Sequence, residues 1–268
     1  MKKQILQCPV CKGALTKEAG AYKCPWNHSF DIAKEGYVNL LISGKGSSNS
    51  GDDKQMVVSR TNFLDKGFYS PLREKVCEII KSFCIEDISL LDSGCGEGYY
   101  TSEYAKLCDT CVGIDISKNA VKSASKRCKE ATFAVASVYH LPIMEESIDV
   151  IVNCFSPNAC DEFSRVLKKD GYLIYVVPGA KHLWELKGIL YDSPYENEEK
   201  TEEYDGFELY ETHRVSTRFS LSGNDEIMSL YHMTPYTWTT PKDGAERLSR
   251  LSMLDVSAEF KIYIYKRK

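Results

Sequence analysis

Apolar and polar positions alternate regularly between residues 88 and 190. Short runs rich in Val, Ile, Leu and Tyr are separated by amphipathic stretches, a pattern that predicts strands joined by helices. The predicted strands cover 88–92, 111–115, 132–136, 148–153 and 172–177, and the predicted helices cover 99–107, 117–129, 159–167 and 182–190. This alternation indicates an α/β fold, with a mostly parallel sheet covered by helices on both faces.

The segments on either side of this region follow other patterns. Two amphipathic helices are predicted over 54–65 and 71–83. Two alternating segments, 207–221 and 257–266, are predicted to pair antiparallel at the edge of the sheet. Ligands of such sheets bind at the carboxyl ends of the parallel strands, so we expect the functional residues there.

A polar stretch rich in glycine and serine occupies residues 43–53. Such a composition is typical of a flexible linker. The chain is therefore predicted to contain a small N-terminal domain over 1–42, a linker over 43–53 and a larger domain over 54–268.

The N-terminal segment contains a pattern of metal ligands. Cys8, Cys11, Cys24 and His28 follow the spacing C-x2-C-x12-C-x3-H, and the residues between the two pairs read as a hairpin. Two such pairs are what a tetrahedral zinc site needs, and four protein ligands leave no open position for catalysis. We therefore predict one structural Zn²⁺ per chain, which contributes much of the folding energy of so small a unit.

A glycine-rich turn, D-S-G-C-G-E-G from Asp92, follows the strand predicted at 88–92. Glycines let a backbone approach its ligand closely. Asp115 ends the second predicted strand, where an acid lies beside such a turn and can accept both hydroxyls of a ribose. The spacing differs from the dinucleotide fingerprint. Taken alone, however, the turn suits other nucleotides, or plain tight packing, equally well.

The turn and the acid together resemble motif I and the ribose-binding acid of class I S-adenosylmethionine-dependent methyltransferases. The matching segments are D-S-G-C-G-E-G and G-I-D-I-S. The resemblance implies a Rossmann-like fold with S-adenosyl-L-methionine as cofactor. Ser137 follows the third predicted strand, where such enzymes contact the adenine and often carry Asp, so this residue departs from the pattern.

The N-terminal residues narrow the resemblance from class I methyltransferases in general to one family. C-P-V-C, C-P-W-N-H and F-D-I-A-K-E-G-Y-V-N-L-L are similar to the N-terminal zinc ribbon of the 23S rRNA (guanine-N1-)-methyltransferase family, which includes a tylosin-resistance enzyme. Nearly the whole chain takes part, and the acidic segment and the C-terminal tail match least well. Other matching segments are Gly51-Asp52 with Met56 and Arg60, Phe63 to Leu72, Leu141-Pro142, Ser156-Pro157 and Pro178 to Lys187.

This resemblance implies methylation of N1 of one guanine in a hairpin loop in domain II of 23S rRNA. The candidates for the guanine pocket are Asn153, Phe155 and Pro157. No catalytic base is identified, because Asp161 and Glu162 are interpreted as acids on a helix surface. The cofactor-binding residues expected from the turn, the strand ends and the resemblance are Tyr69, Asp92, Gly94, Cys95, Gly96, Glu97, Gly98, Asp115, Ile116, Ser137, Val138, Asn153 and His182.

Charge is distributed unevenly along the 268 residues, whose net charge is −4. Residues 192–211 carry nine acids against one lysine, which leaves a net +4 on the rest, and seven lysines lie in the first 47 residues. This distribution keeps RNA binding open, so we expect the acidic segment to lie away from the RNA.

The remaining composition indicates where the protein works. No apolar run approaches the roughly 18 residues needed to span a bilayer, so no membrane partner is expected. Eleven cysteines without a secretory signal indicate a reducing cytoplasm. The expected partner is a 23S rRNA hairpin, and the sequence is compatible with a homodimer.

Two alternatives accompany this interpretation. One is a methyltransferase of a small molecule with a structural zinc ribbon, which would show flat salt dependence and activity on a metabolite. The other is a zinc-dependent RNA-binding protein with an inactive methyltransferase fold. The intact glycine turn and Asp115 speak against the second, and failure to bind the cofactor would support it.

Overall fold

The structure is a computed structural model that describes residues 3–42, 51–199 and 203–268. Most of the predicted linker, 43–50, lies outside the described residues. The helices are α1 (Lys54–Leu64), α2 (Ser70–Ser82), α3 (Thr101–Tyr104), α4 (Lys118–Arg127), α5 (Cys160–Val166), α6 (Trp184–Leu190), α7 (Asn224–His232) and α8 (Lys242–Ser249). The strands are β1 (Thr16–Glu18), β2 (Ala21–Lys23), β3 (Ser29–Asp31), β4 (Val38–Asn39), β5 (Ser89–Ser93), β6 (Thr110–Asp115), β7 (Thr132–Val135), β8 (Ile148–Cys154), β9 (Leu167–Pro178), β10 (Phe207–Ser222) and β11 (Met253–Arg267).

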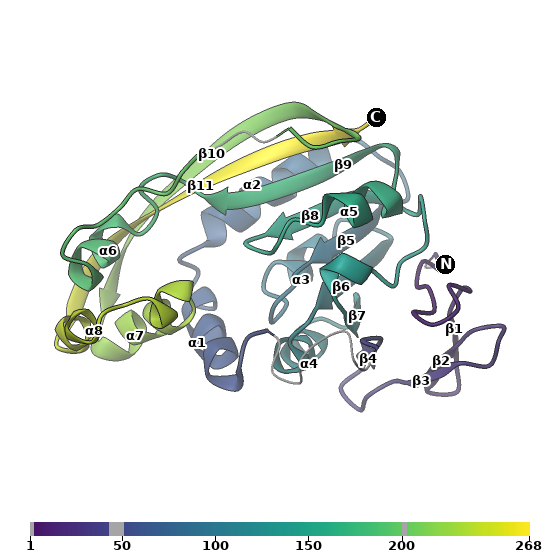
Figure 1. The fold of residues 1–268 in the computed structure, drawn as a ribbon, viewed down its shortest axis with the longest axis horizontal. Helices are drawn as coiled ribbons and strands as arrows, with labels where there is room; N and C mark the ends of the chain where they lie inside the picture. Colours follow the sequence, from purple (N-terminus) through teal and green to yellow (C-terminus); the bar gives the residue numbers. More distant parts are fainter. Residues whose placement is uncertain (1–2, 43–50, 200–202) are drawn as a thin grey trace.

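A central sheet organises the larger part of the molecule. Within the described chain its strand order is β10-β11-β9-β8-β5-β6-β7-β4 (Figure 1). The strands from β9 to β4 run parallel, whereas β10 and β11 form an antiparallel pair at one edge. The predicted α/β fold and the predicted edge pair are confirmed. Because the chain leaves β5 first toward β6 and later returns to β8, the switch in strand order lies between β5 and β8, where a ligand crevice is expected.

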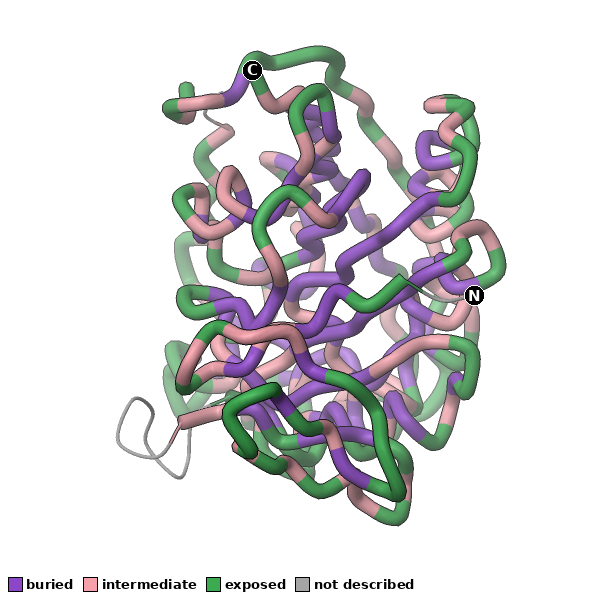
Figure 2. The backbone as a smooth tube through the Cα atoms, turned by 90° about the vertical axis from the view of Figure 1, so that its right-hand side faces the viewer, coloured by how far each residue is buried: buried purple, intermediate pink, exposed green. Residues whose placement is uncertain are grey.

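Both faces of this sheet are covered, and adjacent residues of one strand serve different cores. In β5, Leu90 belongs to the same core as Val76 of α2 and Val121 of α4, while Leu91 belongs to the core that holds Phe163 of α5. Successive side chains of a strand point to opposite faces, which explains the division. Figure 2 shows the buried segments running through the middle of the molecule, with exposed turns around them.

Capping residues set where two helices begin. The carboxylate of Asp53 accepts a hydrogen bond from the backbone N–H of Met56 at 2.9 Å, at the start of α1. The hydroxyl of Ser117 accepts one from the N–H of Ala120 at 3.3 Å, at the start of α4. Both groups satisfy a donor that the first helical turn leaves open, and α4 begins where the helix over 117–129 was predicted to begin.

The N-terminal ribbon consists of β1, β2 and β3, paired antiparallel. Main-chain bonds tie it to the larger domain: the N–H of Gln7 donates to the carbonyl of Pro142 at 2.8 Å, and the N–H of Met144 donates to the carbonyl of Ile5 at 2.9 Å. In addition, β4 pairs in parallel with β7 and so completes the central sheet. The ribbon is therefore fixed to the sheet, although the domain boundary after residue 42 stays a prediction.

The region after β10 contains helices that the sequence pattern did not predict. The aromatic segment 231–238 forms the end of α7 and a 3-10 turn, and α8 follows. These helices and the ribbon lie at opposite ends of the long axis (Figure 1). The helix predicted over 99–107 is also shorter than expected, because α3 covers Thr101–Tyr104 alone.

None of the helices in the described ranges combines the length and the apolar character that crossing a bilayer requires.

Candidate active site and metal centre

The four predicted metal ligands lie together. The Sγ atoms of Cys8, Cys11 and Cys24 and a ring nitrogen of His28 are all within 4.8 Å of one another. Cys11 Sγ and Cys24 Sγ are 3.5 Å apart, and His28 Nδ1 lies 3.6 Å from Cys8 Sγ and 3.3 Å from Cys24 Sγ. A tetrahedral zinc with bonds of about 2.0–2.3 Å separates its ligands by roughly 3.3–3.8 Å. The donor set therefore fits one Zn²⁺ held entirely by protein atoms.

Each pair of ligands is carried by a tight turn. The N–H of Lys12 donates to the carbonyl of Cys8 at 2.9 Å, and the N–H of Asn27 donates to the carbonyl of Cys24 at 3.0 Å. Lys12 and Asn27 both have φ of +64°, in the left-handed region. These turns direct the side chains of each pair to the same side, which is what a shared metal requires.

The glycine turn follows β5, and each of its glycines adopts positive φ: +83° at Gly94, +54° at Gly96 and +83° at Gly98. A Cβ on Gly94 would lie 2.3 Å from the Oγ of Ser156, and one on Gly98 would lie 2.9 Å from the Cα of Ala124. Glycine is therefore required at both positions, by conformation and by space. The first contact also fixes the turn against the loop that follows β8.

Asp115, at the end of β6, closes the turn from the side. Its Oδ2 accepts the N–H of Gly96 at 3.0 Å, and its Oδ1 accepts the N–H of Ser117 at 2.8 Å. Burial raises the pKa of the Asp115 carboxyl, and these two N–H groups oppose that rise. Each carboxylate oxygen has further acceptor capacity, so this acid can also receive ribose hydroxyls.

The other two acids of the turn are buried. The hydroxyl of Thr101 donates to Asp92 Oδ2 at 2.5 Å, which connects β5 to the start of α3. Burial raises the pKa of Asp92 to about 7, against the effect of that hydrogen bond. Burial likewise raises the pKa of Glu97, and the nearby charge of Arg60 opposes the rise. The predicted roles of Asp92, Cys95 and Glu97 toward a cofactor stay predictions.

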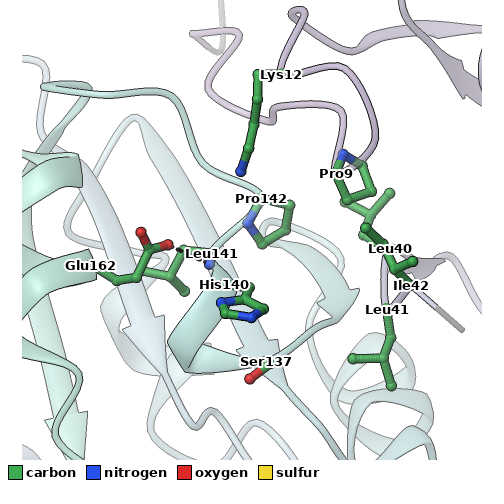
Figure 3. Close-up of a pocket in the computed structure, with 10 residues that line it drawn as sticks. All are labelled: Pro9, Lys12, Leu40, Leu41, Ile42, Ser137, His140, Leu141, Pro142 and Glu162. Carbon is green, nitrogen blue, oxygen red and sulfur yellow. Dashed lines mark hydrogen bonds between the residues drawn. The ribbon is translucent and has the colours of Figure 1, made fainter. Parts of the chain in front are cut away.

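A cavity of about 160 Å³ lies where the ribbon meets the end of β7. Figure 3 shows Pro9 and Lys12 of the ribbon on one side of it and Ser137, Leu141 and other residues of the larger domain on the other. The Oγ of Ser137 accepts the N–H of Tyr139 at 3.3 Å and so shapes the turn that includes Val138. The ribbon thus contributes directly to the carboxyl end of the sheet.

Glu162 of α5 lies at this junction and is more enclosed than the helix-surface position predicted for it. It is half-buried, its Oε2 accepts the N–H of Leu141 at 2.6 Å, and its Oε1 accepts Arg165 Nε at 2.7 Å. Burial alone would raise the pKa of Glu162, but these two partners lower it below its ordinary value. The carboxylate therefore braces the segment between β7 and the ribbon.

The loop after β8 carries the candidates for the guanine pocket. The side-chain amide of Asn153 donates to the carbonyl of Pro157 at 2.9 Å, and its Oδ1 accepts the N–H of Ser156 at 3.3 Å. Asn153 is fully buried and braces the loop from inside. Phe155 is 45% exposed and has φ of +56°, a conformation that costs a non-glycine residue on the order of 1–3 kcal/mol. Such strain is typical of functional positions.

Tyr69 and His182 are brought together beside this loop. His182 Nδ1 lies 2.7 Å from the carbonyl oxygen of Glu259, so Nδ1 carries the proton and donates it. Nε2 then accepts from the hydroxyl of Tyr69, at 3.4 Å. Burial lowers the pKa of His182 to about 4, so the ring is neutral near pH 7. The ring of Phe155 lies 6.2 Å from that of His182, between centroids.

The structure adds two residues that sequence reasoning did not place in the site. Arg60 of α1 forms an ion pair with Asp52, from the end of the predicted linker. The carbonyl of Asp52 accepts the hydroxyl of Ser117 at 2.6 Å, and a Cβ on Gly51 would lie 2.8 Å from Cγ2 of Ile116. Residues 51–53 therefore lie against the end of β6. No local pattern marks this contact, because it joins segments that are distant in sequence.

Comparison with known proteins finds a match for both parts of the chain, the zinc ribbon and the larger domain with the glycine turn. Residues 91–175 match the family described as a methyltransferase domain, and residues 6–48 match the zinc-ribbon family described as RlmA, N-terminal. The chain is 32% identical to YxjB of Bacillus subtilis (strain 168), described as a candidate 23S rRNA (guanine-N(1)-)-methyltransferase, over 97% of this chain and 96% of that protein.

Two further relatives also align over most of their length. One, from Micromonospora griseorubida and described in the same way, is 32% identical over 93% of this chain and 91% of that protein. The other is the 23S rRNA (guanine(748)-N(1))-methyltransferase of Streptomyces fradiae, 29% identical over 94% and 93%.

These matches identify the groups that the two sites hold. The methyltransferase domain implies S-adenosyl-L-methionine as cofactor, and the turn with Asp115 has the shape and the acceptors for its nucleoside. The ribbon family and the four clustered donors imply one structural Zn²⁺. The chain belongs to the family of 23S rRNA (guanine-N1-)-methyltransferases that carry an N-terminal zinc ribbon.

Proposed function

We propose that this protein transfers the methyl group of S-adenosyl-L-methionine to N1 of a guanine in a hairpin loop of domain II of 23S rRNA. The observation that carries the proposal is the likeness to relatives named for this reaction over nearly the whole chain, ribbon included. A likeness confined to residues 91–175 would support a methyltransferase of any substrate. The proposed partner is a 23S rRNA hairpin, and the proposed location is the cytoplasm.

The reaction is a direct displacement at a methyl carbon. The new bond joins that carbon to guanine N1, the carbon–sulfur bond breaks, and the N1 proton leaves. When bound, S-adenosylmethionine supplies the methyl group on a sulfonium centre. The chain's part is to align the two reactants and to accept charge and proton, since alignment alone lowers such a barrier substantially.

Residues at the carboxyl ends of β5 and β6 support the cofactor half of this proposal. Asp115 is held by two N–H groups beside the glycine turn, in place to receive the ribose hydroxyls. Gly96 keeps the backbone of the turn open to the ligand. We propose the remaining residues at these strand ends, including Ile116, Ser137 and Val138, as the surroundings of the adenine.

The loop after β8 supports the substrate half. A guanine in a hairpin must leave its stack before a pocket can enclose N1. The exposed ring of Phe155 offers a flat apolar surface at this point, and the buried amide of Asn153 holds the loop in shape. Neutral His182 and the hydroxyl of Tyr69 lie beside that ring, so hydrogen-bonding groups and a stacking surface are present together.

Primer extension on ribosomal RNA tests the proposal. N1-methylguanine blocks base pairing, so reverse transcription stops one nucleotide before it. RNA from cells with the gene should show a stop in a domain II hairpin, and deletion of the gene should remove it. Expression of the wild-type chain should restore the stop, whereas Asp115→Ala should not. A deletion that leaves every stop in place contradicts the proposal.

The small-molecule alternative predicts a different result in the same material. Purified protein would then methylate a metabolite, and its activity would change little between low and high salt. Methylation of a hairpin transcript that falls steeply with salt supports the RNA substrate instead, because phosphate contacts release counterions.

A further inference from the structure

Arg60 occupies a defined place beside the glycine turn. A Cβ built on Gly96 would have Nη1 of Arg60 as its nearest neighbour, at 3.8 Å. The same Nη1 pairs with Asp52, and Nη2 lies 3.4 Å from the carbonyl oxygen of Met233, at the end of α7. The side chain is only 24% exposed. The guanidinium is thus held from two sides, and Gly96 of the turn lies next to it.

Acidic groups surround this cation. Burial alone would lower the pKa of Arg60, but the charges of Asp52, Glu97 and Asp115 raise it instead. In return, its charge opposes the burial-driven rise in the pKa of Glu97 and of Asp115. It acts in the same direction on the buried thiol of Cys154, at the end of β8. Arg60 is therefore a positive centre between the carboxyl ends of β5, β6 and β8.

The charges of the cofactor explain why such a centre is useful. The methionyl end of S-adenosylmethionine carries an ammonium, a sulfonium and one carboxylate. The acids of the turn favour the two cations and repel the carboxylate, unless a positive group meets it. A guanidinium suits this task, because its planar fork matches a carboxylate and its charge persists at every physiological pH.

We propose that Arg60 is a cofactor-binding residue whose guanidinium pairs with the methionyl carboxylate beside Gly96, while Asp52 fixes its orientation. The pairing couples α1 to the cofactor, since the same side chain reaches α1, the segment at 51–53 and the end of α7. This inference rests on the proposed function for the identity of the cofactor.

Decarboxylated S-adenosylmethionine isolates the interaction, because it lacks the carboxylate and keeps the nucleoside, the sulfonium and the amine. Titration calorimetry with the purified full chain measures both ligands. The wild type should bind S-adenosylmethionine more tightly than the decarboxylated form. Arg60→Met should lower the affinity for S-adenosylmethionine by roughly tenfold to a hundredfold, the range for loss of a charged hydrogen bond. Its affinity for the decarboxylated ligand should change by less than about threefold.

Two further variants give the experiment its controls. Arg60→Lys keeps a charge and should retain part of the preference for the carboxylate. Arg127→Met removes a second arginine, which pairs with Asp65 at 2.7 Å, and should leave the preference unchanged. Circular dichroism and thermal unfolding confirm that each variant is folded.

The outcomes separate this inference from the proposed function. One contrary result is that the wild type binds S-adenosylmethionine while Arg60→Met still prefers it fully over the decarboxylated form, or loses affinity for both ligands equally. In either case the inference is wrong and the proposed function stands. If Arg60→Met lowers only the affinity for a hairpin transcript, Arg60 contacts RNA and the inference is again wrong. If the wild type binds neither ligand at millimolar concentration, the proposed function fails as well.

Discussion

Two tryptophans of this molecule are largely exposed to solvent: Trp26 is 74% exposed and Trp238 is 71% exposed. Trp26 lies on the second zinc turn, between Cys24 and His28, whereas Trp238 ends a 3-10 turn between α7 and α8. Figure 1 shows α7 and α8 at the end of the long axis opposite to the ribbon. A single exposed aromatic residue is common and needs no explanation by itself. An exposed aromatic ring on a turn that carries two zinc ligands, however, suits the stacking of an RNA base.

We expect Trp26→Ala to weaken binding of the hairpin transcript by about 1–3 kcal/mol, the range for loss of one stacked base. Affinity for S-adenosylhomocysteine should not change, because the ribbon turn is separate from the glycine turn. Filter binding measures the first quantity and calorimetry the second. Trp238→Ala is the matched control and should leave both unchanged. Equal effects of the two substitutions would show that Trp26 has no special contact with RNA.

His182 should make stability depend on pH. Its native pKa of about 4 lies below the ordinary value of 6.5, so the unfolded chain takes up a proton at higher pH than the native protein does. The free energy of unfolding should therefore fall as pH drops from about 6.5 to about 4, by an amount approaching 3 kcal/mol for this residue.

His182→Gln removes this contribution. Urea unfolding at several pH values should show wild type losing more stability than the variant across that window. Asp92 acts in the opposite direction, because its raised pKa makes the native protein bind a proton more readily. It is present in both proteins and cancels in the difference. Parallel curves for the wild type and His182→Gln would show that His182 titrates in the native protein as it does in the unfolded chain.

At this scale, residues within one motif could be predicted and partners across the fold could not. Cys8 and Cys11 reveal their role by spacing, as does the glycine turn. Arg60 is one charged residue of an amphipathic helix, and only the packing of α1 brings it to Gly96. The hydrogen bond of Glu162 to Leu141 could not be predicted for the same reason, since Leu141 lies 21 residues away in sequence.

Among the elements, the zinc ribbon offers the clearest test. Purified protein should contain about one zinc per chain, and Cys8→Ser should reduce the content well below one. Cys84→Ser changes an exposed cysteine outside the ribbon and should leave the zinc content at about one per chain. Metal analysis gives the content, and hydrogen exchange over 5–31 reports the order of the ribbon. Full metal content in Cys8→Ser would contradict the assigned ligands.

Loss of zinc should also affect the larger domain. Ile5, Leu6 and Leu15 of the ribbon are buried in the same core as Phe163 of α5. We therefore expect Cys8→Ser to lower the melting temperature of the whole chain, with cofactor affinity changed less than RNA methylation. The strands of the parallel sheet were predictable because each carries its own apolar run. The pairing of β4 with β7 was not, because two residues form no pattern.

At the scale of the whole molecule, the ribbon and the acidic segment adjoin opposite edges of the central sheet. The ribbon adjoins the β4 edge, while the acidic segment leads into β10 at the opposite edge. We therefore propose that the RNA approaches the β4 edge, away from the acidic segment. We therefore expect the exposed lysines of the ribbon to contact RNA phosphates.

Salt titrations of hairpin binding test this arrangement. If Lys12, Lys17 and Lys23 each contact a phosphate, their joint change to alanine should reduce the slope of log affinity against log salt by about 2, at roughly 0.7 per contact. Lys242→Ala, on α8 at the far end, should leave the slope unchanged. An unaltered slope in the triple variant would place the phosphate contacts elsewhere.

The chemistry of this protein was readable from its sequence, because ligand spacing, a glycine turn and a strand-ending acid are local features that a few neighbouring residues encode. The sequence therefore determined the α/β fold, the zinc and the cofactor class. Only the tertiary structure decided which distant side chains meet: Tyr69 with His182, 113 residues apart, Arg60 with Gly96, and the ribbon with the edge of the sheet. Such contacts depend on packing of whole elements, and no local pattern records them.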